Sequence, residues 1–225
     1  RDSNAVRNAS VQFAISQAPI GATGQSLSTT STTTDTMGQA STRLTLGSKI
    51  GTYQVSATSG GLVGSPSTFF AQALSSTARF LANMRGSGQQ KTVATQLDTA
   101  FVTRVTDVGG NPVPGVLVQF AIASAPAGAA GQSLSASLDT TDVNGEASTT
   151  LTLGNKIGSY TVRSISSAVA GDTAYFAANG TSALAASVTG LSGDGQSGFA
   201  TSLLAQPFIV TVKDAFGNPV AGVNV

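Results

Sequence analysis

The stretch Gly110-Asn111-Pro112-Val113-Pro114-Gly115-Val116-Leu117-Val118-Gln119-Phe120 predicts a tight turn that leads directly into a β-strand. Glycine and proline supply the backbone conformations that tight turns require. After them, Val116, Val118 and Phe120 follow at every second position, so their side chains lie on one face of the strand. A strand with one apolar face buries it against another layer, which favours a packed β-sheet protein.

The same phrase occurs three times, at a spacing of 107 positions. Its second occurrence is the final stretch, Gly217-Asn218-Pro219-Val220-Ala221-Gly222-Val223-Asn224-Val225. A degenerate occurrence near the start keeps only Asn4, Val6 and Val11-Gln12-Phe13. Because a fixed internal period determines the architecture of a chain, this spacing is the main organising feature of the sequence.

Two longer matches support the spacing. Residues 11–55 match residues 118–162 without a gap, with 30 identities in 45, and residues 101–118 match 208–225 with 10 identities in 18. A unit near 107 residues exceeds the length of a solenoid repeat and suits an independent sandwich domain in a tandem array. We therefore expect one repeat lacking its first strands at 1–73, a complete repeat at 76–180, and the opening part of a third at 183–225. The short boundaries predict stiff coupling between neighbouring repeats.

The complete repeat predicts about seven short strands separated by turn signals, and none of its segments keeps a helical period. Asn144-Gly145 is the strongest hairpin signal in the chain. The alternation predicts a two-sheet sandwich whose largest core side chains are Phe120, Leu151, Tyr160 and Phe176. The expected strands lie at residues 78–84, 101–106, 116–122, 134–138, 147–153, 159–165 and 174–178, and residues 86–90 are expected to form a polar loop.

Composition excludes several classes of function. The chain has no cysteine and no histidine, so disulfides, thiol nucleophiles, histidine-based catalytic triads and typical zinc sites are impossible. Charged residues make up only 9% of the 225 residues and the net charge is +1, without the basic stripe that nucleic-acid binding needs. We expect no enzyme activity, no cofactor and no small-molecule substrate.

Two groups of polar residues are candidates for chemical sites. Asp139, Asp142, Asn144 and Glu146 could offer oxygens to calcium, but their spacing is not that of an EF-hand, and a capped turn is the preferred interpretation. Lys49 and Lys156 recur at equivalent positions, each before Ile-Gly. A solvated turn lysine is favoured there over an isopeptide crosslink, because lysine is almost never buried unpaired. No catalytic, cofactor-binding or metal-ligating residue is predicted.

The phrase Asp214-Ala215-Phe216-Gly217-Asn218-Pro219-Val220-Ala221-Gly222-Val223 resembles the signature of the group 1 bacterial Ig-like domains, which occur in invasin- and intimin-type adhesins. The complete repeat agrees with that pattern along its length, and Asn4-Ala5-Val6-Arg7-Asn8 departs from it by losing both proline and glycine. The resemblance implies an all-β fold of tandem Ig-like β-sandwich domains. It also implies a structural role in a fibre or adhesin stalk on the bacterial surface, outside the cell.

Two other functions remain open. The first is a self-assembling, pilus-like filament subunit, in which residues 183–225 complete residues 1–73 of the next molecule by strand donation. In that case Phe208, Val210 and Val212 would pair with the first repeat of a neighbouring molecule. The second is a spacer within a large secreted enzyme. The expected partners are thus neighbouring repeats or molecules of the same protein, and the sequence identifies no host receptor.

Overall fold

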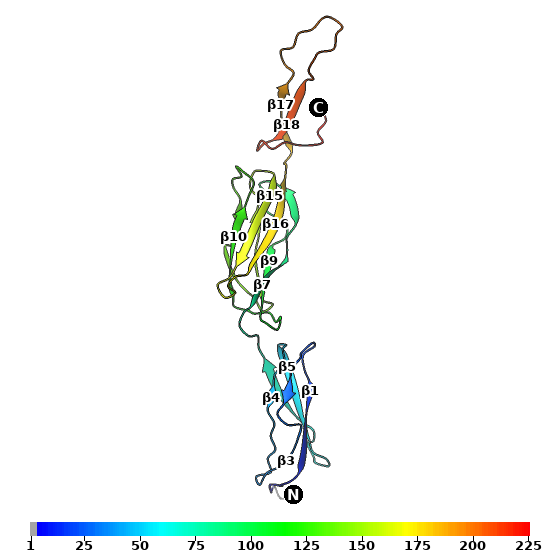
Figure 1. Ribbon diagram of the computed structural model, residues 1–225, viewed down its shortest axis with the longest axis vertical. Coiled ribbons are helices and arrows are strands. Elements are labelled where there is room, and N and C mark those ends of the chain that lie inside the picture. The colour runs from blue at the N-terminus through cyan, green and yellow to red at the C-terminus, as the bar shows by residue number, and fades with distance from the viewer. Residues whose placement is uncertain (1–3) are drawn as a thin grey trace. The chain divides into compact units, whose positions relative to one another are not determined.

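The computed structural model describes residues 4–225, which form strands β1 to β18 and no helix (Figure 1). This confirms the all-β prediction. The described chain divides into two compact units, one made of the residues up to Arg79 together with Thr106–Val113, the other of Phe80–Val105 and Pro114–Val225. The expected division into three repeats stays a prediction, and "first", "second" and "third repeat" below refer to residues 1–73, 76–180 and 183–225.

The second unit contains a complete two-layer sandwich. One layer is a five-stranded sheet in the order β12-β10-β15-β16-β8, and the other is a three-stranded sheet in the order β13-β9-β7, with the short pair β11-β14 beside them. The strands are β7 (Phe80–Arg85), β8 (Gln89–Thr92), β9 (Phe101–Thr106), β10 (Leu117–Ser124), β11 (Ser133–Leu134), β12 (Leu138–Thr140), β13 (Glu146–Thr149), β14 (Leu151–Thr152), β15 (Gly158–Ile165) and β16 (Thr173–Thr181).

The core of this sandwich lies between the two sheets. The four large side chains predicted from the sequence, Phe120, Leu151, Tyr160 and Phe176, are all buried. The ring of Phe101 on β9 stacks on that of Phe176 on β16 at a centroid distance of 4.9 Å. The same core holds one polar pair, in which the Thr103 and Ser164 hydroxyl oxygens lie 2.6 Å apart. Burial of these alternating side chains is the main stabilising term of the fold.

The first unit has only one of the two large layers. Its four-stranded sheet has the order β3-β1-β5-β6, beside the short pair β2-β4. These strands are β1 (Ser10–Gln17), β2 (Ser26–Leu27), β3 (Ser31–Thr33), β4 (Leu44–Thr45), β5 (Gly51–Thr58) and β6 (Ser67–Ala73). Strand β1 shows the same register shift next to β5, between Ile15 and Gln17, that β10 shows next to β15 between Ile122 and Ser124. The two remaining strands, β17 (Ala185–Ser192) and β18 (Ile209–Asp214), form an antiparallel pair in the second unit.

The structure corrects four local predictions, of which the first is that the strand expected at 147–153 is divided into β13 and β14, which belong to different sheets. The Asn144-Gly145 turn does not close a hairpin, since β12 before it pairs with β10 whereas β13 after it pairs with β9 in the other sheet. The loop expected at 86–90 includes the start of β8, which runs parallel to β16. The single extended segment expected at 134–138 is split between β11 and β12. In each case the strand is defined by a partner that is distant in sequence.

Candidate functional site: the turn that joins consecutive repeats

The turn at residues 107–111 is organised by one buried carboxylate. Oδ1 of Asp107 accepts hydrogen bonds from the backbone N–H groups of Gly109 and Asn111, both at 2.9 Å. Oδ2 accepts from the backbone N–H of Ser76 at 3.0 Å and from Nδ2 of Asn111 at 3.0 Å. Gly110 adopts a φ of 73°, a left-handed conformation that favours glycine. In the sequence Asp-x-x-Gly-Asn, the aspartate carboxylate therefore accepts hydrogen bonds from the backbone N–H groups of its own turn.

The environment of Asp107 favours its ionised form. Burial raises the pKa of the Asp107 carboxyl, but the hydrogen bonds from Ser76, Asn111 and Gly109 together outweigh burial and hold the pKa below its usual value. The carboxyl of Asp214, at the equivalent place in the third repeat, is governed by the same balance and also has a lowered pKa. Both turns therefore carry a fixed negative charge at neutral pH.

The loop that precedes β5 is held by a buried tyrosine. The hydroxyl of Tyr53 donates a hydrogen bond to the backbone carbonyl of Lys49 at 2.9 Å. A side chain at Gly47 would not fit, because a Cβ there would lie 2.9 Å from the Tyr53 hydroxyl and 2.7 Å from Oε1 of Gln25. The recurring Leu-Gly-x-Lys-Ile-Gly-x-Tyr sequence thus forms a loop whose conformation is fixed by the buried tyrosine.

Three hydrogen bonds join this loop to the turn. Nδ2 of Asn111 donates to the carbonyl of Ser48 at 2.9 Å, and Oδ1 of Asn111 accepts from the N–H of Ile50 at 3.2 Å. Nζ of Lys49 donates to the carbonyl of Gly109 at 2.7 Å. We call this set of three bonds the latch. It connects the first repeat of the sequence to the opening turn of the second, and all its residues belong to the first compact unit.

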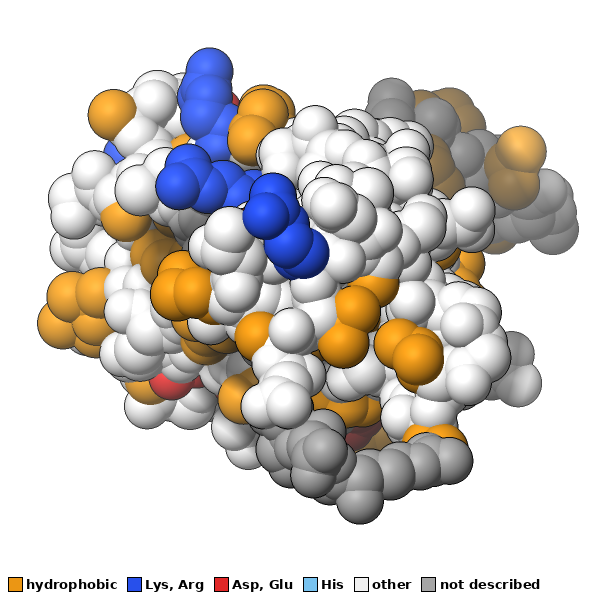
Figure 2. Space-filling view, turned by 90° about the horizontal axis from the view of Figure 1, so that it is seen from below, with side chains coloured by type: hydrophobic (Ala, Val, Ile, Leu, Met, Phe, Trp, Pro, Cys, Tyr) orange, Lys and Arg blue, Asp and Glu red, His pale blue; other side chains and the backbone are white. Residues whose placement is uncertain are grey.

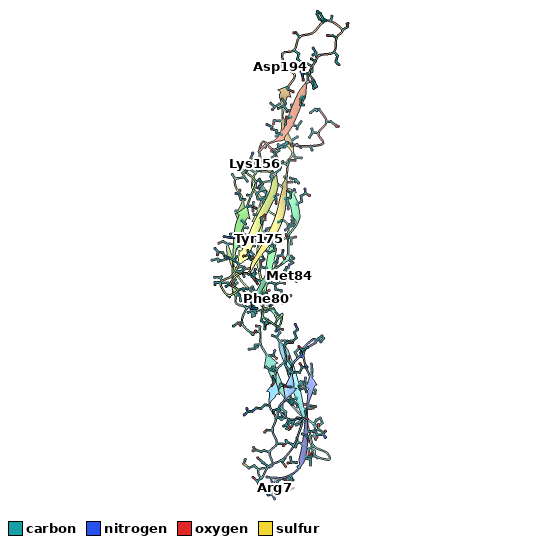
Figure 3. The ribbon with its side chains drawn as sticks, in the orientation of Figure 1. Arg7, Phe80, Met84, Lys156, Tyr175 and Asp194 are labelled. Carbon is teal, nitrogen blue, oxygen red and sulfur yellow. The ribbon has the colours of Figure 1, made fainter. Side chains whose placement is uncertain are left out.

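The same latch recurs 107 positions later in the second unit. Asn218 donates to the carbonyl of Asn155 at 2.9 Å and accepts from the N–H of Ile157 at 3.3 Å. Lys156, labelled in Figure 3 close to the start of the third repeat, donates to the carbonyl of Phe216 at 2.9 Å. The Tyr160 hydroxyl donates to the carbonyl of Lys156 at 2.6 Å. Each latch bond of the first set thus has a counterpart at the equivalent position.

The structure changes how the two groups of candidate polar residues are interpreted. Lys49 and Lys156 are not simply solvated, since each binds a carbonyl of the following turn. Asp142 caps its own turn by accepting from the N–H groups of Asn144 and Glu146, as the preferred interpretation predicted. Glu146 forms an ion pair with Arg85 at 2.8 Å, and Asp139 accepts from the N–H of Ser148. These three carboxylates are therefore each engaged by protein groups.

Sequence reasoning treated the Asp-x-x-Gly-Asn turn as a local device and missed the latch. The available signal was that Asp107 and Asn111 recur together as Asp214 and Asn218, as do Lys49 and Lys156. Between residues 4 and 225, no group of three or more carboxylates is placed to hold a metal ion. In the same range, no helix has the length and apolar character needed to cross a membrane.

Comparison with solved structures finds the same fold in other bacterial proteins. The structure of FdeC, an Escherichia coli adhesin, matches 97% of the chain with a TM-score of 0.60 at 18% identity. The fold is that of the FdeC adhesin. The structure of InvD from Yersinia pseudotuberculosis matches 98% of the chain with a TM-score of 0.50 at 16% identity. The chain covers 67% of the FdeC chain and 64% of the InvD chain.

At the level of sequence, no protein-family model and no curated protein matches the chain. The likeness to FdeC and InvD therefore rests on the arrangement of strands, which confirms the predicted Ig-like β-sandwich fold.

Replacing Asn218 with alanine should release the loop at 155–157. The substitution removes the acceptor for the N–H of Ile157 and the donor to the carbonyl of Asn155. We expect hydrogen exchange at the Ile157 amide to accelerate by about tenfold, which corresponds to one net hydrogen bond. Asn144→Ala is the matched control, because Asn144 bonds only within its own turn to Asp142. Equal exchange at Ile157 in both variants would contradict a latching role.

Acid should weaken the two turns. A carboxyl whose pKa is lowered by folding contributes stability that is present above its unfolded pKa, about 3.9, and is lost as the pH falls through the folded value. Exchange protection at Asn111 and Asn218 should therefore stay constant down to about pH 4 and fall below it. In an Asp107→Asn, Asp214→Asn double variant, this acid-dependent decrease should be absent. A decrease that persists in the variant would assign the pH dependence to other carboxyls.

Proposed function

We propose that the chain is a non-catalytic structural segment of an extracellular bacterial surface adhesin, built from tandem Ig-like domains that form its stalk. The fold it shares with the FdeC adhesin supports this role. The absence of histidine and cysteine and the low charge are consistent with it. On the face shown in Figure 2 most of the described side chains are uncharged, basic side chains gather in one area, and acidic side chains are sparse.

The observation that carries the proposal is the repetition of the latch. A stalk must hold consecutive domains in a defined order and resist their separation. The Asp-x-x-Gly-Asn turn and the Lys-Ile-Gly loop make the same contact twice, with asparagine bonds of 2.9 Å in both places. Such a contact between consecutive repeats has a mechanical use and offers no group that could activate a substrate. In this role the partner of each repeat is the repeat that follows it.

The proposal is tested by locating the protein on the cells that produce it. Antibodies raised against the 225-residue chain should label intact, unpermeabilised cells, because a stalk segment lies outside the cell. Antibodies against a cytoplasmic protein serve as the control and should label only permeabilised cells. If the antibodies against the chain also label only permeabilised cells, the proposal is refuted. Recovery of the chain in the medium as part of a catalytic polypeptide would instead favour a spacer in a secreted enzyme.

A further inference from the structure

The outer face of the five-stranded sheet in the second unit carries large apolar and aromatic side chains that the first repeat lacks. Leu117, Leu138 and Tyr175 are 55%, 53% and 55% exposed on this face, and Ile165 lies half-buried between them. The residues 107 positions earlier all carry a hydroxyl group: Ser10, Ser31, Thr68 and Thr58. A single exposed leucine needs no explanation, but a group of such side chains on one sheet face is typical of an interaction surface.

The strand register places these side chains in one patch. Gln119 on β10 pairs with Leu138 on β12 and with Ile165 on β15, and Ile165 pairs with Thr173 on β16. Tyr175 lies two residues beyond Thr173, so its side chain is on the same face in the adjacent row. Neighbouring strands are about 4.8 Å apart and adjacent rows about 7 Å apart. The patch therefore spans four neighbouring strands.

Part of this face is hollowed. Leu117, Leu138 and Ile165 line a hollow of about 380 Å³, together with residues of the loop that follows β15. Tyr175, labelled on the second unit in Figure 3, does not line the hollow and is exposed beside it. The volume of the hollow exceeds that of one tyrosine side chain. An aromatic ring seated in a matching pocket is a frequent anchor in protein interfaces.

A projecting side chain and a hollow on the same face make that face self-complementary. A two-fold axis that runs between them turns one copy over the other, so each Tyr175 meets the hollow of the other molecule and every contact occurs twice. The two sheets then pack face to face, as the layers of a sandwich do. The tyrosine and the leucines of the hollow also differ together between repeats, since the first repeat has neither. Such a coupled difference is expected of two parts that bind each other.

The charge on this face is compatible with the same arrangement. Arg163 is exposed and pairs with Tyr175 in the same row. The rotation that brings Tyr175 to the hollow therefore brings Arg163 beside it, over Gln119 of the other molecule. The Gln119 side chain lines the hollow and offers a carbonyl oxygen to the guanidinium group. The two arginines do not meet, so their like charges do not oppose association.

We propose that two copies of the chain associate side by side through this face, with Tyr175 of each inserted into the hollow of the other. The contact joins second repeats of different molecules, whereas the latch joins consecutive repeats of one molecule. The patch is smaller than the about 20–30 residues a side of a stable complex, so association is weak, with a dissociation constant of about 0.1–1 mM. This inference concerns the purified chain and does not depend on its cellular location.

Intermolecular broadening by a spin label tests the arrangement directly. The chain has no cysteine, so Thr140→Cys carries a single thiol, at a position that pairs with Leu117 at the edge of the hollow. A nitroxide attached there should broaden the amide signal of Tyr175 in isotope-labelled molecules mixed with the spin-labelled ones. Thr33→Cys is the matched control, because Thr33 occupies the equivalent place in the first repeat. Equal broadening with both labels, or none at Tyr175, would overturn the proposal.

Sedimentation gives an independent measurement of affinity. The average mass of the full chain should rise with concentration, and Tyr175→Thr should raise the dissociation constant by more than about tenfold, because the anchor is lost. This variant carries the residue of the first repeat at an exposed position, so circular dichroism should show unchanged folding. Val143→Thr, in an exposed turn outside the patch, should associate like the unmodified chain. A chain that stays monomeric up to about 1 mM, or equal association of the two variants, would refute the contact.

Discussion

Replacing Phe176 with alanine is expected to destabilise the second unit by about 3–5 kcal/mol. Phe176 is fully buried between the two sheets, and its ring stacks on Phe101 at 4.9 Å. The substitution removes the apolar surface that the ring buries and leaves a cavity that the opposed strands β9 and β16 cannot close without breaking their pairing. Urea unfolding followed by tyrosine fluorescence or far-ultraviolet circular dichroism measures the change in the free energy of unfolding.

Phe69→Ala provides a matched control within the same chain. Phe69 occupies the equivalent place on β6, but with 56% of its surface exposed it has less burial to lose. Its substitution should therefore destabilise the first unit by about 1 kcal/mol or less in dilute solution. If both substitutions had equal effects at low concentration, the face that carries Phe69 would have to be covered in the single molecule.

Replacing Asp107 with alanine should have the second largest effect, a loss of about 2–4 kcal/mol in the first unit. The carboxylate accepts from the backbone N–H groups of Ser76, Gly109 and Asn111, and the side chain itself is buried. Alanine leaves these three donors without their shared acceptor, and the N–H of Asn111 is the one that lies in a buried residue. Asp107→Asn should be almost as harmful, because its amide would direct a donor at Nδ2 of Asn111 or at the N–H of Ser76.

Asp142→Ala tests whether burial accounts for this effect. Asp142 accepts from the N–H groups two and four positions ahead, as Asp107 does, but it is exposed to water. Its loss should therefore be clearly smaller, because water replaces the lost acceptor. Denaturant unfolding of the two variants, with exchange at Gly109 and Asn111 as the local measure, separates the two cases. Equal losses would mean that turn geometry, and not burial, determines the contribution of Asp107.

The fold could be predicted well because its signals are local. Val116, Val118 and Phe120 alternate strictly, and all lie on the buried face of the sandwich. The strand predicted at 101–106 has the observed bounds of β9. Strand β8 escapes prediction because Gln89-Gln90-Lys91-Thr92 shows no apolar alternation, and its extended form depends on pairing with β16. Turn residues give the position of a turn but not the sheet to which each flanking strand belongs, which explains the Asn144-Gly145 error.

The candidate site was less accessible to sequence reasoning. Asp107 and Asn111 have the composition of an ordinary turn, and only the structure shows that Asn111 also bonds to Ser48 and Ile50. That contact spans more than sixty residues, a separation at which residue type alone gives no guide to proximity. The sequence predicts a solvated Lys49 because lysine is seldom buried with a partner. In the structure, the ammonium group at the end of the Lys49 side chain donates a hydrogen bond to the carbonyl of Gly109 in the next turn.

The partners of the latch side chains are all main-chain atoms. Asn111 and Asn218 bind the backbones of residues that differ, Ser48 in one place and Asn155 in the other, and the lysines bind the carbonyls of Gly109 and Phe216. A backbone carbonyl stays the same when its side chain mutates. These bonds therefore need no particular side chain at residues 48, 109, 155 or 216. A gene of this kind could gain or lose whole repeats by recombination, and the length of the protein could vary without compensating mutations at each new junction.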